Sequence, residues 1–164
     1  MHLAKIAICC FLSLSSCKAK EQHLKFPKEF QGKVIAVKDG DTIEVLFENS
    51  PITIRFAHID CPEIKKHQPF AQAAKKFTSD LCFGQIVTVE NNGEHDRYKR
   101  LIAVIITDKN ENVNKELVKA GLAWHFLKYS TDTSYDNLEA IARQSKIGLW
   151  ADENPTSPWE WRKP

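Results

Sequence analysis

Residues 32–56 restrict the fold most, because apolar and polar residues alternate there with the period of a β-strand. Two turn signals interrupt the alternation: Asp39-Gly40, a strong hairpin signal, and Asn49-Ser50-Pro51. The apolar positions beside these turns are Val34, Ile35, Val37, Ile43, Val45, Phe47, Ile52, Ile54 and Phe56. Three consecutive antiparallel strands are therefore predicted.

After Pro62 the period becomes that of an amphipathic helix, which continues as far as Gly84. Its apolar residues, three and four apart, are Phe70, Ala73, Ala74, Phe77 and Leu81. The other predicted elements are two strands and then two helices, at residues 85–90, 100–107, 113–120 and 134–146. The second of these strands is apolar on both faces and is expected to be central. This order predicts an α+β domain, mainly a five-stranded β-barrel of the oligonucleotide-binding (OB) type with about three helices outside it.

The first 17 residues have the organisation of an export signal, because one cation, Lys5, precedes an apolar run too short to cross a bilayer. The run ends in Leu14-Ser15-Ser16-Cys17, which resembles the lipobox of bacterial lipoproteins. We therefore expect an acylated Cys17 at the start of a membrane-anchored protein of the bacterial envelope. The alternative is cleavage near the serines, which would give a secreted or periplasmic protein. Residues 18–29 are predicted to be a flexible tether, and residues 30–164 one domain.

Bulk charge says nothing about a nucleic-acid partner. The chain has 23 Lys and Arg against 21 Asp and Glu, and loss of Lys5 with the leader leaves a net charge of +1. Local cations can still serve a phosphate, so their location matters more than their sum. The roughly 140 remaining residues suffice for one core. Whether Cys61 and Cys82 form a disulfide is not decided by the sequence.

Three short patches combine acids and bases suited to a phosphodiester: residues 39–42, residues 55–63 and residues 96–100. Asp41 and Asp60 lie at predicted strand ends, where hard carboxylate oxygens suit Ca²⁺ or Mg²⁺. Arg55 and Arg100 can each bind two phosphate oxygens, and Glu63 can accept a proton from water or orient it. Each patch alone has a plainer explanation, as a turn, a helix start or a solvated strand end. Their joint occurrence favours a metal-assisted nuclease, and the absence of CxxC, HExxH and paired-histidine motifs argues against zinc.

With these motifs, residues 30–162 resemble the staphylococcal-nuclease-like (thermonuclease) family, and its exported members share endings such as Pro158-Trp159-Glu160-Trp161-Arg162. The resemblance implies an OB barrel and a Ca²⁺-dependent endonuclease that cuts DNA and RNA at the 5′ P–O bond and leaves 3′-phosphates. The residues that it assigns are the metal ligands Asp41, Asp60 and, through its backbone carbonyl, Cys61, with Arg55, Glu63 and Arg100 catalytic. Cys61 stands where the family has threonine.

The same resemblance implies substrate contacts. Tyr98 occupies the position of a tyrosine near the phosphate of a bound nucleotide, and Arg97 replaces a lysine with its charge kept. Tyr129 lies in the region that stacks on bases, where the alternative is surface packing. Aromatic faces accept any base, which agrees with low sequence preference. The four histidines of the domain, expected to be structural or exposed, are His58, His67, His95 and His125.

Three functions remain open on the sequence. The first is the nuclease, a monomer acting on single- and double-stranded DNA and RNA with Ca²⁺, or with Mg²⁺ or Mn²⁺. The second is a noncatalytic OB module that binds nucleic acid or protein. The third, an envelope interaction protein, rests only on the lipobox. Retention of both carboxylates and both arginines favours the first.

Overall fold

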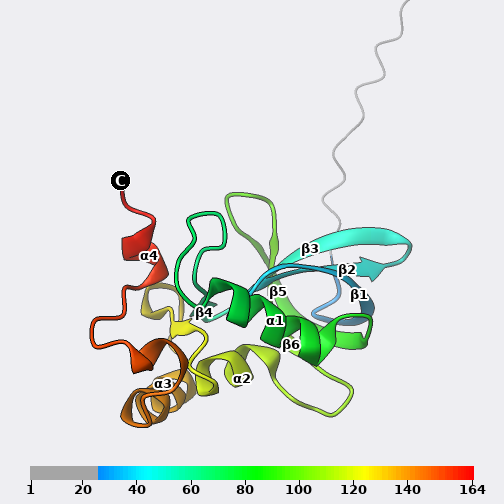
Figure 1. Cartoon of the computed structure of the whole chain (residues 1–164). Helices are drawn as coiled ribbons and strands as arrows, with labels where there is room; N and C mark the ends of the chain where they lie inside the picture. Colours follow the sequence, from blue (N-terminus) through cyan, green and yellow to red (C-terminus); the bar gives the residue numbers. More distant parts are fainter. Residues whose placement is uncertain (1–25) are drawn as a thin grey trace, which may run out of the picture.

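The computed structural model describes residues 26–164, and the expectations for the signal, Cys17 and residues 18–25 lie outside that range. Five strands close into a barrel in the order β1-β2-β3-β6-β5 (Figure 1). Their bounds are β1 (Glu29–Asp39), β2 (Thr42–Phe47), β3 (Ser50–Phe56), β5 (Ile86–His95) and β6 (Leu101–Ile106). The predicted five-stranded OB barrel is therefore confirmed.

Strand β6 is hydrogen-bonded to a neighbouring strand on each side, as its two apolar faces predicted. It pairs with β5 in the antiparallel sense and with β3 in the parallel sense, with Arg55 opposite Ile102. Side chains of Leu101, Ala103 and Ile105 are at most 1% exposed. The parallel pair closes the barrel and brings the end of β3 beside the start of β6.

Four α-helices and two short 3-10 helices lie outside the barrel: α1 (Ala71–Cys82), α2 (Val113–Lys119), α3 (Ser134–Gln144), α4 (Pro158–Trp161), η1 (Leu127–Tyr129) and η2 (Gly148–Ala151). The three predicted helices are confirmed. Helix α2 is joined to the barrel by the fully buried Asn114, whose amide donates to the carbonyls of Ala57 and Ala103 and accepts from the backbone of Ile105. These bonds satisfy buried backbone groups where the ladder between β3 and β6 ends.

The sequence of residues 154–162 predicts an irregular tail whose indoles dock on the core, and the irregularity was wrong in one respect, because residues 158–161 form α4. Pro158 begins this helix, where its missing N–H costs no hydrogen bond. A second sheet that the sequence did not predict pairs β4 (Ile59–Asp60) with β7 (Trp124–His125). It fixes Asp60 opposite Trp124 and so joins the end of the barrel to the C-terminal part of the chain.

Contacts with the barrel begin before residue 30, the predicted start of the domain. Phe26 stacks on Phe30 with ring centroids 5.7 Å apart, and the amide of Asn91 donates to the carbonyl of Pro27. Residues 26–29, assigned above to the tether, therefore contact the barrel. Within residues 26–164, no helix has the length and apolar character required to cross a bilayer.

The β1–β2 turn is held against α1 by a close approach that requires glycine. A Cβ added at Gly40 would lie 2.7 Å from the Cβ of Ala74 and 2.9 Å from the Sγ of Cys61. The Gly40 carbonyl accepts a 2.6 Å hydrogen bond from the Thr78 hydroxyl on α1. The next residue, Asp41, is thereby fixed at the edge of the barrel. Cys61 and Cys82 are both buried free thiols.

Candidate nuclease site

Two buried carboxylates share one arginine at the end of the barrel. Asp41 and Asp60 are 5% and 1% exposed. Nη1 of Arg55 lies 2.9 Å from Oδ2 of Asp41, and its Nη2 lies 2.7 Å from Oδ1 of Asp60. Strands β2, β3 and β4 thus bring together the two acids that the sequence predicted as metal ligands.

The backbone fixes Asp41 further. The amide of Cys61 donates to its Oδ2 at 2.7 Å, and the hydroxyl of Thr42 donates to its Oδ1 at 3.1 Å. Residue 61 therefore contributes a backbone amide to the carboxylate, and the thiol packs near Gly40. The threonine-to-cysteine difference leaves these backbone contacts available.

Arg100 reaches the same edge from the turn between β5 and β6. Its Nε and Nη2 bind Oδ2 of Asp96 at 2.7 and 2.6 Å, and its Nη1 donates to Oγ1 of Thr42 at 3.2 Å. Thr42 therefore links Arg100 to Asp41. Three of the five N–H donors of the guanidinium are used by these partners, which leaves two directed elsewhere.

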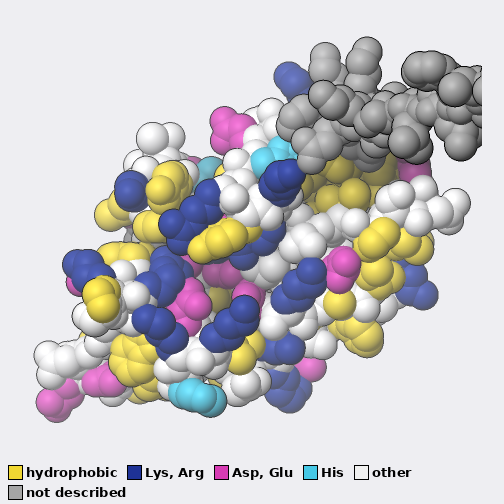
Figure 2. Space-filling model, turned by 90° about the horizontal axis from the view of Figure 1, so that it is seen from above, with side chains coloured by type: hydrophobic (Ala, Val, Ile, Leu, Met, Phe, Trp, Pro, Cys, Tyr) yellow, Lys and Arg dark blue, Asp and Glu magenta, His cyan; other side chains and the backbone are white. Residues whose placement is uncertain are grey.

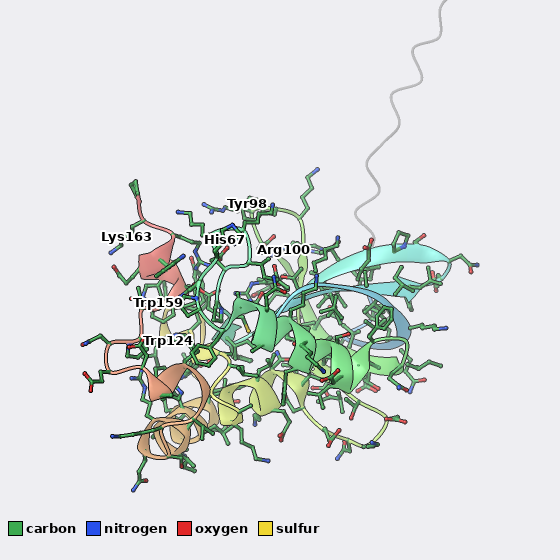
Figure 3. The ribbon with its side chains drawn as sticks, viewed as in Figure 1. His67, Tyr98, Arg100, Trp124, Trp159 and Lys163 are labelled. Carbon is green, nitrogen blue, oxygen red and sulfur yellow. The ribbon has the colours of Figure 1, made fainter. Side chains whose placement is uncertain are left out.

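The predicted substrate residues Arg97 and Tyr98 lie in the same turn. Tyr98 is 64% exposed, and the guanidinium carbons of Arg97 and Arg100 lie 4.7 and 5.4 Å from its ring centroid. Figure 3 shows Arg100 beneath Tyr98, at the top of the barrel. An exposed aromatic ring beside two cations is suited to a nucleotide.

Glu63 lies on the loop after β4 and is held by its backbone. Its amide donates to Oε1 of Gln68, whose Nε2 donates to the carbonyl of Thr156 in the C-terminal segment. The Glu63 carboxylate is 30% exposed and forms a 2.5 Å ion pair with Nη1 of Arg162. The loop and the tail therefore position Glu63 together.

Sequence reasoning missed Arg162 as a site residue. Its Nη2 lies 2.5 Å from Oδ2 of Asp60, so it binds the oxygen opposite to the one that Arg55 contacts. The available signal was a cation at the end of an aromatic motif, Trp159 to Arg162, which was interpreted only as a docking segment for indoles. Nothing local in the sequence joins it to Asp60.

The carboxylates crowd one another electrostatically. Burial, reinforced by the charge of Asp41, raises the pKa of Asp39 to about 7. Burial also raises the pKa of Asp60, although the hydrogen bond from Arg162 and the charge of Arg55 oppose that increase. The pKa of the Cys61 thiol is raised well above its ordinary value, mainly by burial. Burial therefore opposes ionisation of Asp39, Asp60 and the Cys61 thiol, and the thiol stays protonated at neutral pH.

An aromatic wall faces this centre from the C-terminal half. The Trp159 ring lies parallel to that of Phe126 at 5.1 Å, and Tyr129 packs edge-on against Phe126 at 4.9 Å. Tyr129 is nevertheless 66% exposed, and Nζ of Lys128 lies 5.3 Å from its ring centroid. Tyr129 thus packs against Phe126 while most of its surface stays exposed.

A buried network supports the loop that carries Tyr129. His125 contacts Asp136 at 2.6 Å and Ser130 at 2.8 Å, and His58 contacts the same Ser130 hydroxyl at 2.9 Å. No partner for these histidines was predicted, because their contacts are set by tertiary structure. Ser130 is 7% exposed and its oxygen is shared by two imidazoles, so the group acts as a structural clamp.

The paired acids, Glu63, the arginines and the exposed tyrosines line one open cleft of about 2270 Å³. Figure 2 shows acidic side chains near the centre of this face with Lys and Arg side chains around them. Figure 3 places Tyr98 and Arg100 on the barrel side and Trp159 and Lys163 near α4 on the other. The arrangement suits an anionic polymer that crosses the cation-rich rim over an acidic centre.

The donor set fits a hard divalent cation only in part. Asp41 and Asp60 are adjacent oxygen donors, as Ca²⁺ prefers. Within residues 26–164, no group of three or more His, Cys, Asp or Glu side chains is arranged to hold a metal ion. The remaining ligands would have to come from backbone, water and phosphate, as expected for a site with two carboxylate ligands.

The fold and site define a small OB-barrel protein with paired acids and arginines in a cleft suited to phosphodiesters. A family model described as staphylococcal nuclease homologue matches residues 53–152. The chain is 39% identical to an uncharacterized endonuclease of Haemophilus influenzae, over 93% of this chain and 80% of that protein. It is 37% identical to a micrococcal nuclease of Shigella flexneri and 33% identical to protein ParB of Escherichia coli, which each align with 82% of this chain and with 82% and 80% of their own lengths. The chain therefore belongs to the staphylococcal nuclease family.

Proposed function

We propose that this nuclease is a Ca²⁺-dependent endonuclease that hydrolyses DNA and RNA at the 5′ P–O bond and leaves 3′-phosphates. The observation that supports this most is the convergence of Asp41 and Asp60 on one guanidinium, with Glu63 and Arg100 in the same cleft. A phosphodiester is anionic, so its hydrolysis needs neutralising charge, an oriented water and donors that strengthen as charge builds. Each requirement has a candidate residue here.

Asp41, Asp60 and the carbonyl of Cys61 would hold Ca²⁺, which supplies positive charge beside the phosphate when bound. Glu63 orients a water molecule and accepts its proton as the oxygen attacks phosphorus. Arg55 and Arg100 donate to the phosphate oxygens as their charge increases. The bond from phosphorus to O5′ breaks, the leaving oxygen takes a proton, and a 3′-phosphate and a 5′-hydroxyl result.

Binding to single- and double-stranded nucleic acid is proposed to follow the aromatic side chains. Tyr98 and Tyr129 offer exposed faces to bases of any identity, and Arg97 adds charge beside Tyr98. The cation-rich rim binds the backbone without reading sequence. A monomer suffices, because the acids, the arginines and the aromatic wall all come from one chain.

The proposed location is the bacterial envelope, with Cys17 acylated and the barrel outside the cytoplasm. Acyl chains bind membranes in proportion to the methylenes that they bury. Replacement of Cys17 by Ser should release the protein from the membrane fraction. If the variant still partitions with membranes, lipid anchoring at this residue is wrong, and the secreted or periplasmic alternative is not supported either.

The activity is tested with residues 18–164 and three substrates: single-stranded DNA, duplex DNA and RNA, each with Ca²⁺, Mg²⁺, Mn²⁺ or a chelator. We expect cleavage of all three with Ca²⁺ and none with the chelator. Asp60→Asn, which removes a proposed ligand, should need more Ca²⁺, whereas Asp80→Asn, an exposed acid on α1, should behave as wild type. No cleavage under any metal by a folded wild type would favour the noncatalytic binding module.

A further inference from the structure

Arg162 binds the two acids that the proposed chemistry needs free. Its Nη2 contacts Oδ2 of Asp60 at 2.5 Å, and its Nη1 contacts Oε1 of Glu63 at 2.5 Å and Oδ1 of Asp60 at 3.3 Å. One guanidinium thus bridges a proposed metal ligand and the proposed proton acceptor. Bidentate contacts of this kind are among the stronger charged hydrogen bonds.

The tail that carries Arg162 is anchored to the loop beside the site. Nζ of Lys66 donates to the carbonyl of Arg162 at 2.9 Å, and the indole of Trp161 donates to the carbonyl of Lys66 at 3.2 Å. Trp159 is stacked on Phe126. A four-residue helix has little stability of its own, so these contacts decide where Arg162 points.

Hydrogen bonds and ion pairs engage both oxygens of each of the paired acids. Oδ1 and Oδ2 of Asp41 accept from Thr42 and from Cys61 and Arg55, whereas those of Asp60 accept from Arg55 and Arg162. A cation bound to Oδ2 of Asp60 would therefore compete with Arg162, whose Nη2 lies 2.5 Å from that oxygen. Arg55 is 12% exposed and fixed in a barrel strand, whereas Arg162 is 36% exposed on a terminal turn. Arg162 is the group that gives way.

We infer that Arg162 exchanges partners during the reaction: it neutralises Asp60 and Glu63 in the metal-free protein, and it binds a phosphate of the nucleic acid once a divalent cation has taken Asp60. This inference rests on the proposed function. The displaced guanidinium stays within the cleft, because Trp159 and Trp161 keep the tail anchored. A planar, permanently charged fork in that position is suited to phosphate oxygens.

The exchange predicts opposite effects on two affinities when the charge is removed. Arg162→Gln frees Asp60, so Ca²⁺ should bind about two- to fivefold more tightly, as expected for loss of one partly exposed competing ion pair. The same variant lacks a phosphate contact, so its KM for single-stranded DNA at saturating Ca²⁺ should rise, and the slope of log affinity against log salt should fall by about 0.7. General damage to the site would weaken both.

The test is calorimetric titration of Ca²⁺ into the purified full chain, followed by steady-state cleavage at saturating Ca²⁺. The proteins are wild type, Arg162→Gln, Arg162→Lys as the charge-conserving variant, and Lys76→Gln as an exposed cation on α1 that pairs with Asp80 away from the cleft. We expect tighter Ca²⁺ binding with a higher KM in Arg162→Gln, partial restoration of both in Arg162→Lys, and no change in Lys76→Gln.

Unchanged or weaker Ca²⁺ binding by a folded Arg162→Gln protein would overturn the exchange and leave the proposed function intact. An unchanged KM with tighter Ca²⁺ binding would overturn the phosphate contact. If neither wild type nor variant binds Ca²⁺, the proposed metal and the exchange are both wrong. Thermal unfolding of each variant establishes that it is folded.

Discussion

Substitution of Arg55 by Gln should destabilise the metal-free protein strongly. The guanidinium joins two carboxylates that are 5% and 1% exposed, those of Asp41 and Asp60. Breaking a buried ion pair by removing one partner costs about 3 to 5 kcal/mol, because a buried charge is left without a partner. Arg162 still reaches Asp60, so the lower value, about 3 kcal/mol, is expected.

That loss corresponds to a fall in Tm of about 10 °C for a domain of this size. Ca²⁺ should restore most of it, because a ligand at a hundred times its Kd stabilises the folded state by about 2.7 kcal/mol and also replaces the missing charge. The assay is thermal unfolding of wild type, Arg55→Gln and Lys76→Gln with chelator and with Ca²⁺. Lys76 pairs with Asp80 on the exposed face of α1 and serves as the control.

Lys76→Gln should change Tm by no more than about 3 °C, since exposed pairs contribute at most about 1 kcal/mol. A fall in Tm for Arg55→Gln as small as that of the control would refute the reasoning. So would an equal Ca²⁺-induced gain in wild type and variant, since the metal would then not be compensating for the lost guanidinium.

Three further results are expected. Burial raises the pKa of Asp96, but hydrogen bonds and the charge of Arg100 outweigh it and hold this pKa below its ordinary value of 3.8. Asp96 therefore stabilises the fold above about pH 4, and the Tm deficit of Asp96→Asn at pH 7 should shrink as the pH falls below that value. Gly40→Ala places a Cβ 2.9 Å from Cys61 Sγ, so thermal unfolding should show a loss of about 1 to 3 kcal/mol, and calorimetry should show weaker Ca²⁺ binding. Burial raises the pKa of Cys82 to about 12, so iodoacetamide at pH 8 should label it, by mass spectrometry, only after denaturation.

The elements that the sequence predicted are those long enough to show a period. Strands β1, β2, β3 and β6 and helices α1 to α3 each bury a regular set of side chains, so their apolar residues recur at two or at three and four. Sheet β4–β7 has strands of only two residues, and α4 has four, which is too short for either period. Their positions depend on contacts between segments far apart in the chain.

Separation along the chain also explains why Asp41, Arg55 and Asp60 were predicted as site residues and Arg162 was not. Asp41 and Arg55 lie at the ends of strands that pair in the meander, and Asp60 follows Arg55 by only five residues, so local sequence brings the three together. Arg162 reaches Glu63 across 99 residues, through a tail whose path is set by aromatic packing. No periodic or local signal encodes such a contact. The Ser130 clamp on His58 and His125 was missed for the same reason.

Arg162 also affects access to the paired acids. The acidic centre is closed by a guanidinium from the tail, while the aromatic wall and the β5–β6 turn remain exposed. Metal and nucleic acid would therefore both affect Arg162, because the metal displaces it from Asp60 and a phosphate of the nucleic acid then binds it. The account predicts that Ca²⁺ and substrate each increase the affinity of the other, as coupling between sites requires.

The most direct test of the central claim compares cleavage of a 5′-labelled single-stranded DNA by wild type and Glu63→Gln with Ca²⁺, with analysis of the product ends. Glu160→Gln, an exposed acid on α4 that pairs with Lys163, is the matched control. The account predicts 3′-phosphate ends from wild type and the control, and a rate lower by a factor of about 10² to 10⁴ for Glu63→Gln in a folded protein. Wild-type activity in Glu63→Gln, or 5′-phosphate products from wild type, would contradict it.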